Sequence, residues 1–282
     1  MYPAGVPGVS VELVALTSGI TVRVATSGPD DGPAVVLLHG WGASLYMHRC
    51  ALEELAAAGF RAIAPDLRGH GLSDKPRGPG SYTTAAYVDD LFALMDQLGV
   101  ERASVVGQSM GAAIAVHAAL RRPERVERIV LINPPNLVWI PYPRLASMIG
   151  ERVLDRVAPH VVPRWVTRLV LRHVAYSNPS LVTERDVDEY WAPVQFPDYP
   201  RAAAALLNQF DWRPITESQL TELAPRTLII LGKRDRLIRG TLRAVSRVAG
   251  LRTVILDGGH CVNEERAGEV CELIAGFVGE ER

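Results

Sequence analysis

The sequence predicts an α/β fold with a mostly parallel central sheet, helices on both faces of the sheet and one helical insertion. Short apolar runs alternate with stretches of helical periodicity, the pattern of strands joined by right-handed helical crossovers. Several apolar runs end in glycine-rich turns. The alternation stops at about residue 134 and resumes at about residue 215. We therefore expect a core formed by residues 1–133 and 215–282, and an insertion at 134–214.

Apolar runs and turn signals place the elements along the chain. The runs 9–13 and 20–25 are expected to form a hairpin. The run 34–38 is short and entirely apolar, as expected for a strand buried in a parallel sheet. The later strands are expected at 61–64, 103–106, 128–132, 226–231 and 253–256, and core helices at 47–58, 84–98 and 112–120.

Length and composition fit a single α/β domain with a sizeable core, because 48% of the 282 residues are hydrophobic. The formal net charge is −1, so nothing indicates a nucleic-acid partner. The N-terminus does not resemble a signal peptide, and no segment is long and apolar enough to span a bilayer. Cys50, Cys261 and Cys271 lack motif spacing, which favours a cytoplasmic location. No histidines and carboxylates show convincing metal-ligand spacing.

A serine flanked by glycines follows the run 103–106. Residues 107–111 read G-Q-S-M-G, and a helical pattern begins directly after them. In a strand–turn–helix context, such a strained turn lifts the serine hydroxyl to the carboxyl edge of the sheet. The glycines matter because a Cβ there would collide with the neighbouring strand or helix. The alternative is a glycine-rich turn that holds a serine by chance. The context favours Ser109 as a nucleophile at a helix N-terminus, where N–H groups stabilise an oxyanion.

A serine nucleophile needs a base, and the base needs a carboxylate to orient it. Asp235 lies in the loop 232–235 and His260 in the loop 257–260, each just after an apolar run. Such strand ends are where ligands bind in open α/β sheets. The chain order of serine, acid and histidine matches that of known hydrolytic sites on this kind of sheet. We expect Asp235 to be the acid and His260 the base.

Other carboxylates and histidines compete for these roles. Asp257 is too close to His260 in sequence to orient its ring easily, so we interpret Asp257 as a turn-forming residue. The strand 128–132 ends at Asn133, which offers no carboxylate. The remaining competitors are interpreted as structural: Asp66 and Asp74 organise a loop, His39 and His70 make structural hydrogen bonds, and His48, His117, His160 and His173 lie in helix-like stretches.

The loop after the run 34–38 offers a second donor for an oxyanion. Residues 39–42 read H-G-W-G. The backbone N–H of Trp41 would act here together with the N–H of Met110, the residue after the nucleophile. Side-chain identity is almost free at such positions because the backbone makes the contact. The alternative is an ordinary glycine-rich turn, with Trp41 and Met110 as pocket lining.

These ordered motifs together resemble the α/β-hydrolase superfamily, in its lidded, single-domain serine esterase and haloperoxidase-like branch. The matching segments are H-G-W-G at 39–42, D-L-R-G-H-G-L-S at 66–73, G-Q-S-M-G at 107–111, G-K-R-D at 232–235 and G-H-C-V-N-E-E-R at 259–266. The resemblance implies an α/β-hydrolase fold and a lid inserted between the sixth strand and the acid strand.

The resemblance also bears on the choice of nucleophile, and the chain departs from the pattern of many relatives at two places. Epoxide hydrolases and dehalogenases of this superfamily use an aspartate nucleophile, so Ser109 argues against both activities. Many relatives place a proline shortly after the acid loop, whereas Leu237 and Ile238 follow here. Ala112 stands where many relatives carry a further glycine. Both departures leave the three expected catalytic residues in place.

The insertion is dense in prolines and aromatic residues. As a lid it would cover Ser109, exclude water and shape the substrate pocket. Trp139, Trp165 and Trp191 are candidate substrate-binding residues, although most of the aromatics are expected to form the insertion's own small core.

A row of arginines in the insertion allows two interpretations. Arg164, Arg168 and Arg172 recur at helical spacing. A solvated helix face is the favoured interpretation. The second is a docking stripe for an acidic partner such as an acyl carrier protein.

These patterns lead to the hypothesis of a serine hydrolase that cleaves an ester, thioester or related acyl substrate through an acyl-enzyme. The mechanism needs no cofactor. Hydrolysis of a C–C bond in a diketone-like substrate is a close variant. Two other classes remain open: a biosynthetic tailoring enzyme that catalyses elimination, cyclisation or acyl transfer, and a non-catalytic small-molecule receptor.

Overall fold

The computed structural model describes residues 1–137, 162–238 and 240–280. In these residues eight strands form one sheet in the order β1-β2-β4-β3-β5-β6-β7-β8. β2 pairs antiparallel with β1 and β4, and the other neighbours are parallel, so the expected α/β fold with a mostly parallel sheet is confirmed. The strands are β1 (Val9–Ala15), β2 (Thr21–Ser27), β3 (Ala34–Leu38), β4 (Arg61–Pro65), β5 (Ala103–Gln108), β6 (Val126–Ile132), β7 (Thr227–Gly232) and β8 (Arg252–Leu256).

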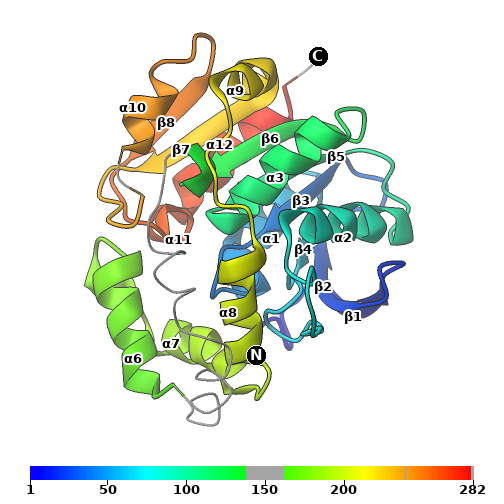
Figure 1. Ribbon diagram of the computed structural model, residues 1–282, viewed down its shortest axis with the longest axis vertical. Helices are drawn as coiled ribbons and strands as arrows, with labels where there is room; N and C mark the ends of the chain where they lie inside the picture. Colours follow the sequence, from blue (N-terminus) through cyan, green and yellow to red (C-terminus); the bar gives the residue numbers. More distant parts are fainter. Residues whose placement is uncertain (138–161, 239, 281–282) are drawn as a thin grey trace.

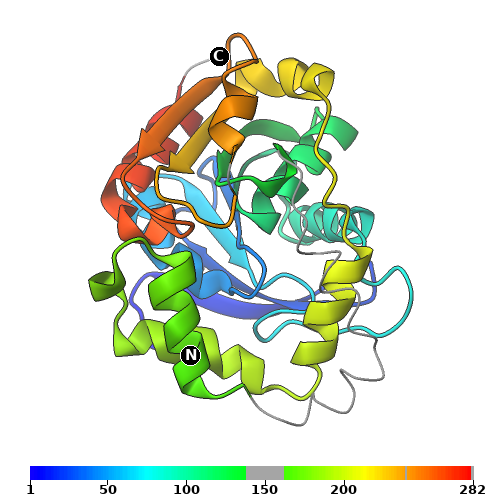
Figure 2. The same ribbon diagram turned by 60° about the vertical axis from the view of Figure 1, so that its left-hand side comes forward.

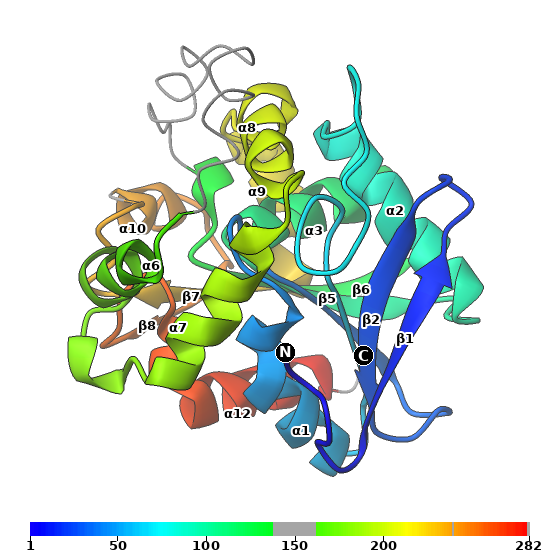
Figure 3. The ribbon, with the colours of Figure 1, turned by 90° about the horizontal axis from the view of Figure 1, so that it is seen from below.

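Helices cover both faces of the sheet, as Figure 3 shows. α2 (Thr84–Gln97), α3 (Met110–Arg121) and α9 (Glu217–Leu223) pack on one face. α1 (Arg49–Ala57) and α12 (Ala267–Val278) pack together on the other. Two short helices follow the last strands, α10 (Thr241–Val245) and α11 (Val262–Glu265). No helix in the described part of the chain is long and apolar enough to cross a membrane.

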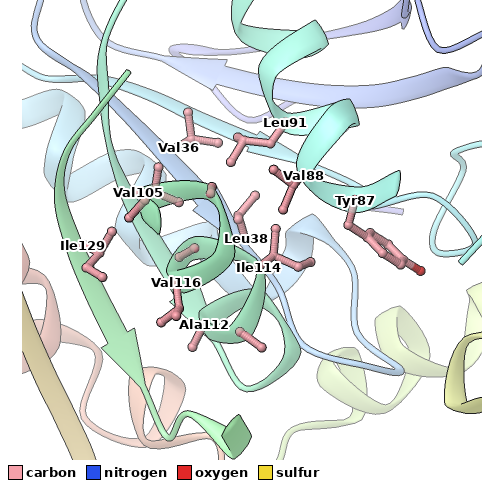
Figure 4. Packing of buried hydrophobic residues seen from close by; sticks show 14 of the residues in the cluster. Val36, Leu38, Tyr87, Val88, Leu91, Val105, Ala112, Ile114, Val116 and Ile129 are labelled. Carbon is pink, nitrogen blue, oxygen red and sulfur yellow. The ribbon is translucent and has the colours of Figure 1, made fainter. Parts of the chain in front are cut away.

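The core around α3 fixes the position of the turn that holds Ser109. Side chains of α3, α2 and strands β3, β5 and β6 meet in one apolar cluster (Figure 4). Small residues such as Ala112 let α3 approach the sheet closely, and Ile114 fills the space toward α2. Burying one such large side chain contributes about 1.5–3 kcal/mol. Because the first turn of α3 is buried in this way, the preceding residue is held firmly at the end of β5.

The chain between β6 and β7 breaks the alternation of strands and helices, as expected. α6, α7 and α8 lie together at the lower end of the molecule in Figures 1 and 2. α8 also packs against the main core, since the Phe210 ring that follows it lies 5.8 Å from that of Tyr87. The division into a core and a lid domain stays a prediction. The described elements are η2 (Pro135–Leu137), α6 (Arg164–Val170), η3 (Leu171–Ala175), η4 (Pro179–Leu181), α7 (Glu184–Trp191), η5 (Ala192–Gln195) and α8 (Tyr199–Gln209).

The arginine row of α6 pairs with acidic residues of α7. Arg164 donates to Asp188 at 2.6 Å and to Glu184 at 2.8 Å. Arg168 donates to the same Glu184 at 2.5 Å. The row therefore carries less free positive charge than its sequence pattern indicates. An acyl carrier protein as partner stays a prediction.

A largely buried cluster of charged and phenolic groups ties α7 to the core. The Arg49 guanidinium contacts Glu264 and donates to Asp186 at 3.0 Å. The Tyr46 hydroxyl donates to Asp186 at 2.8 Å, and the Tyr190 hydroxyl donates to Glu264 at 2.6 Å. Burial raises the pKa of Glu264, against the opposing effect of the Arg49 charge. The cluster holds this part of the insertion against both parts of the core, through Tyr46 and Arg49 in the first and Glu264 in the second.

Candidate active site

The ends of four parallel strands meet at one edge of the sheet. β3 is followed by the loop 39–42, β5 by Ser109, β7 by Asp235 and β8 by His260. β5 pairs parallel with β3 and β6, and β7 pairs parallel with β6 and β8. The fold therefore brings all the expected site segments to the same edge, where open α/β sheets bind ligands.

Ser109 has a strained backbone at the start of α3. Its φ is 51° and its ψ is −116°, an uncommon conformation for a residue with a Cβ, which costs on the order of 1–3 kcal/mol. The flanking glycines are required by close packing. A Cβ at Gly107 would lie 2.2 Å from the Gly111 oxygen, and one at Gly111 would lie 2.1 Å from the Leu38 oxygen. Ser109 thus sits in the tight strand-to-helix turn that the sequence indicates.

The loop 39–42 lies against this turn. A Cβ at Gly40 would be 3.2 Å from the Ser109 Cβ, so the backbone of the loop passes beside the serine. α3 begins at Met110, and the first N–H groups of a helix have no partner within the helix. The Trp41 ring is half-exposed, and its Nε1 donates to the Ala203 oxygen of α8 at 3.4 Å. An oxyanion hole formed by Trp41 and Met110 stays a prediction that this arrangement permits.

His260 is hydrogen-bonded to Asp235, with 2.8 Å between Nδ1 and Oδ2. The other oxygen, Oδ1, accepts the N–H groups of Leu237 at 2.8 Å and Ile238 at 3.1 Å. Burial alone would raise the pKa of Asp235, but the hydrogen bond and charge of His260 and these two N–H groups outweigh burial and lower the pKa. A proline, which lacks an N–H, could not replace Leu237 or Ile238 in this contact.

The competing carboxylates lie elsewhere. Asp257 is exposed and accepts a hydrogen bond of 2.6 Å from Arg234. Asp66 is fully buried and accepts from the Arg23 side chain at 2.7 Å and from the Leu45 N–H at 2.8 Å. Asp66 thus organises its loop, and among the described carboxylates Asp235 is the one bonded to the His260 ring.

The buried histidines of the first half of the chain make structural contacts. His39 Nε2 accepts the Leu67 N–H at 3.0 Å, which places the ring proton on Nδ1, facing the Gly40 oxygen. Burial, followed by the effect of His70, lowers the pKa of His39 well below its usual range. Burial also lowers the pKa of His70 to about 4. Both rings are therefore neutral near pH 7. Within the described residues, no cluster of His, Cys, Asp or Glu could hold a metal ion.

The model of the alpha/beta hydrolase fold family matches residues 33–267, most of the chain. The chain belongs to the α/β-hydrolase family. It is therefore an enzyme of the α/β-hydrolase class.

Named relatives of this α/β-hydrolase span nearly its whole length. It is 31% identical to the AB hydrolase superfamily protein YfhM of Bacillus subtilis (strain 168), over 93% of this chain and 96% of that protein. It is 28% identical to Epoxide hydrolase 1 of Siraitia grosvenorii, with the same shares covered. The solved enol-lactonase from Burkholderia xenovorans LB400 is 26% identical, with a TM-score of 0.75 over 95% of this chain and all of that one.

The loop that carries His260 in this α/β-hydrolase is held by contacts that the motif at 259–266 did not explain. The Gly259 N–H donates to Glu265 at 2.5 Å, and the Cys261 N–H donates to the Ala175 oxygen at 3.1 Å. Glu265 also accepts from the N–H and hydroxyl of Ser177. Ala175 and Ser177 belong to the insertion, so the insertion and the histidine loop are fixed to each other. Glu265 belongs to the motif at 259–266, but the motif does not reveal its contact with Ser177, which comes from a distant part of the chain.

The candidate substrate-binding tryptophans have different environments. Trp139 lies outside the described residues. Trp165 is 61% exposed on α6. Trp191 is partly buried at the end of α7, and its Nε1 donates to the Val162 oxygen at 2.8 Å. A substrate-binding role for these residues stays a prediction.

Proposed function

We propose that this α/β-hydrolase is a serine hydrolase that cleaves esters, thioesters or related acyl compounds through an acyl-enzyme. The observation that carries the proposal is the hydrogen-bonded pair of Asp235 and His260, at the same sheet edge as the strained Ser109. A serine on a tight turn with a buried, carboxylate-oriented histidine near it is the arrangement that activates a hydroxyl.

The proposed reaction has two halves. Ser109 attacks the acyl carbonyl while His260 takes its proton at Nε2 and passes it to the leaving alcohol or thiol. Asp235 keeps the Nδ1 proton of His260 facing its own carboxylate and stabilises the imidazolium. The N–H groups of Trp41 and Met110 hold the oxyanion. A water molecule, deprotonated by His260, then releases the acid and restores Ser109.

The identity of the nucleophile favours an acyl substrate over an epoxide, although several relatives are named epoxide hydrolases. Attack of a carboxylate on an epoxide gives an ester, which water can hydrolyse at its carbonyl. Attack of the Ser109 hydroxyl would give an ether, which has no carbonyl, so turnover would stop after one event. With an ester or thioester, Ser109 instead forms an ester that His260 and water can cleave.

The enol-lactonase, similar in fold and 26% identical, supports the same substrate chemistry. A lactone is an internal ester, and its opening passes through the same oxyanion as the cleavage of an open-chain ester. We propose that the insertion acts as a lid that excludes water and supplies apolar contacts to the acyl group. Its contacts with the loop of His260 place it beside the proposed base.

The direct test is to capture the acyl-enzyme. We expect the protein to hydrolyse p-nitrophenyl acetate and butyrate, and rapid acid quenching to yield protein carrying the acyl mass on Ser109, mapped by peptide mass spectrometry. Absence of both turnover and acylation with any ester, thioester or lactone would refute the proposal and leave a receptor. An acylated Ser109 whose acyl group leaves without incorporation of ¹⁸O from labelled water would indicate acyl transfer or cyclisation.

The proposed lid makes a separate prediction about substrate size. Replacing Trp165 by alanine should lower kcat/KM for a bulky acyl ester by on the order of tenfold while acetyl esters are little affected, because lost apolar contact weakens only the substrate that makes it. Steady-state kinetics on an acyl-length series measures this. Leu13→Ala on β1 is the control, as Leu13 is also an exposed apolar residue. An equal loss for all esters would show that Trp165 supports the catalytic residues; no loss would place it outside the pocket.

A further inference from the structure

The main-chain oxygen of His260 is held by two buried side-chain amides. Gln108 Nε2 and Asn133 Nδ2 each donate to this oxygen at 2.9 Å. Gln108 comes from the end of β5, next to Ser109, and Asn133 directly follows β6. The two residues are 1% and 2% exposed, and a buried amide is costly unless it is hydrogen-bonded. Their donors converge on the backbone of the proposed base.

Asn133 joins the segments that carry the proposed acid and base. Its Nδ2 also donates to the Gly259 oxygen at 3.0 Å. Its Oδ1 accepts the Gly232 N–H at 2.8 Å, at the end of the strand that leads to Asp235. The Asn133 side chain therefore links the end of β7, which leads to Asp235, to the loop after β8, which carries His260. The 2.8 Å contact between His260 and Asp235 is made across this same junction.

The backbone at Asn133 is uncommon and directs its side chain. Its φ is 45°, and among described residues other than glycine only Ser109 shares a positive φ. Asparagine tolerates this left-handed region better than most residues. The side chain of Gln108 is also confined, because its Oε1 lies directly against Gly40. A Cβ at Gly40 would be only 2.2 Å from this oxygen. An uncommon backbone kept at a sheet edge invites a functional explanation.

We propose that Gln108 and Asn133 form an amide clamp, a pair of positioning residues that fix His260 relative to Asp235 and Ser109. The inference rests on the proposed function, in which His260 is the base. The clamp adds to the contacts of this loop with Glu265 and Ala175, because Gly258 and Gly259, which precede His260, give the loop little stiffness of their own. Amides suit the task because they donate hydrogen bonds without adding a charge beside the imidazole.

The test compares two clamp variants with a matched control in the full-length protein. Asn133→Asp keeps the shape and the acceptor for the Gly232 N–H but removes both donors. Gln108→Met keeps the length and removes the donor. The control, Thr227→Val, removes a buried hydrogen bond of 2.6 Å from Thr227 Oγ1 to the Leu223 oxygen at the opposite end of β7. Kinetics with p-nitrophenyl butyrate, thermal unfolding and the proton NMR signal of the His260 Nδ1–H are measured for all three.

We expect each clamp variant to lower kcat by roughly 10- to 100-fold with KM nearly unchanged, as for a misplaced catalytic group. Their double variant should lose less than the product of the single effects, because both hydrogen bonds end on one oxygen. The Nδ1–H signal should shift or broaden in the clamp variants only. The control Thr227→Val should keep its kcat and its Nδ1–H signal even if its Tm falls as far as the Tm of the clamp variants.

Full kcat and an unchanged Nδ1–H signal in Gln108→Met would overturn the clamp, and this variant decides the matter if Asn133→Asp does not fold. The clamp would also be overturned if kcat fell with Tm in the control to the same extent as in the clamp variants. That result would show that Gln108 and Asn133 have a merely structural role. The NMR signal reports on the His260–Asp235 contact whether or not the protein cleaves esters. A failed clamp is thereby distinguished from a failed function, which would show as a wild-type protein that a fluorophosphonate does not label at Ser109.

Discussion

Ser109→Ala should abolish ester turnover, with kcat falling on the order of 10⁶-fold, as when the nucleophile of a serine protease is removed. The reason is that, in the described part of the chain, Ser109 is the serine that stands in the strained turn between β5 and α3, beside the loop 39–42. The fold should persist, because alanine lacks only the hydroxyl and the strained turn is imposed by the packing of Gly107 and Gly111. Steady-state kinetics and labelling by a fluorophosphonate probe measure the effect.

Ser104→Ala is the matched control for this variant. Ser104 lies on β5, the strand that leads to Ser109, and is buried toward the opposite end of that strand. The Ser104→Ala variant should keep wild-type activity, and the fluorophosphonate probe should still label Ser109 alone. Labelling that survives in Ser109→Ala, or turnover within tenfold of the wild type, would show that another residue is the nucleophile.

Asp235→Asn should lower kcat by roughly 10³–10⁴-fold, by analogy with the acid of a serine protease. The hydrogen bonds explain why an isosteric change is so harmful. The asparagine oxygen would keep the N–H groups of Leu237 and Ile238, so its NH₂ would face His260 Nδ1. That ring nitrogen would then have to accept, the proton would move to Nε2, and His260 could no longer take a proton from Ser109.

Asp257→Asn should change kcat little, because Asp257 is exposed and bonded to Arg234. If the two substitutions had reversed effects, the assignment of the acid would be wrong.

Stability gives a second readout for Asp235. The folded-state pKa of Asp235 is lowered, so its carboxylate stabilises the fold above the pKa of the unfolded chain. This contribution is lost as the pH falls through the folded pKa, so the Tm difference between wild type and Asp235→Asn should shrink in acid.

Much of the fold could be predicted from the sequence because burial leaves local patterns. The apolar run of β3 and the turn signals around Ser109 depend only on neighbouring residues, and the structure places both as expected. The bounds of one helix differ from the expectation. The helix expected at 47–58 begins with the 3₁₀ turn η1 (Leu45–His48), capped by Ser44, before α1 starts at Arg49. Helix starts depend on capping contacts that periodicity does not report.

The sequence by itself determined that strands alternate with helices, that Ser109 stands in a tight turn, and that Asp235 and His260 follow strands. It did so because strand ends and turns are set by residues adjacent in the chain. The sequence also favoured Asp235 over Asp257, and the tertiary structure shows the contact of Asp235 with the His260 ring. Only the tertiary structure decided that the arginines of α6 face α7. Gln108 and Asn133 likewise contact His260, although each lies more than a hundred positions away from it in the chain. Such contacts are set by how strands and helices pack, and packing leaves no local signature.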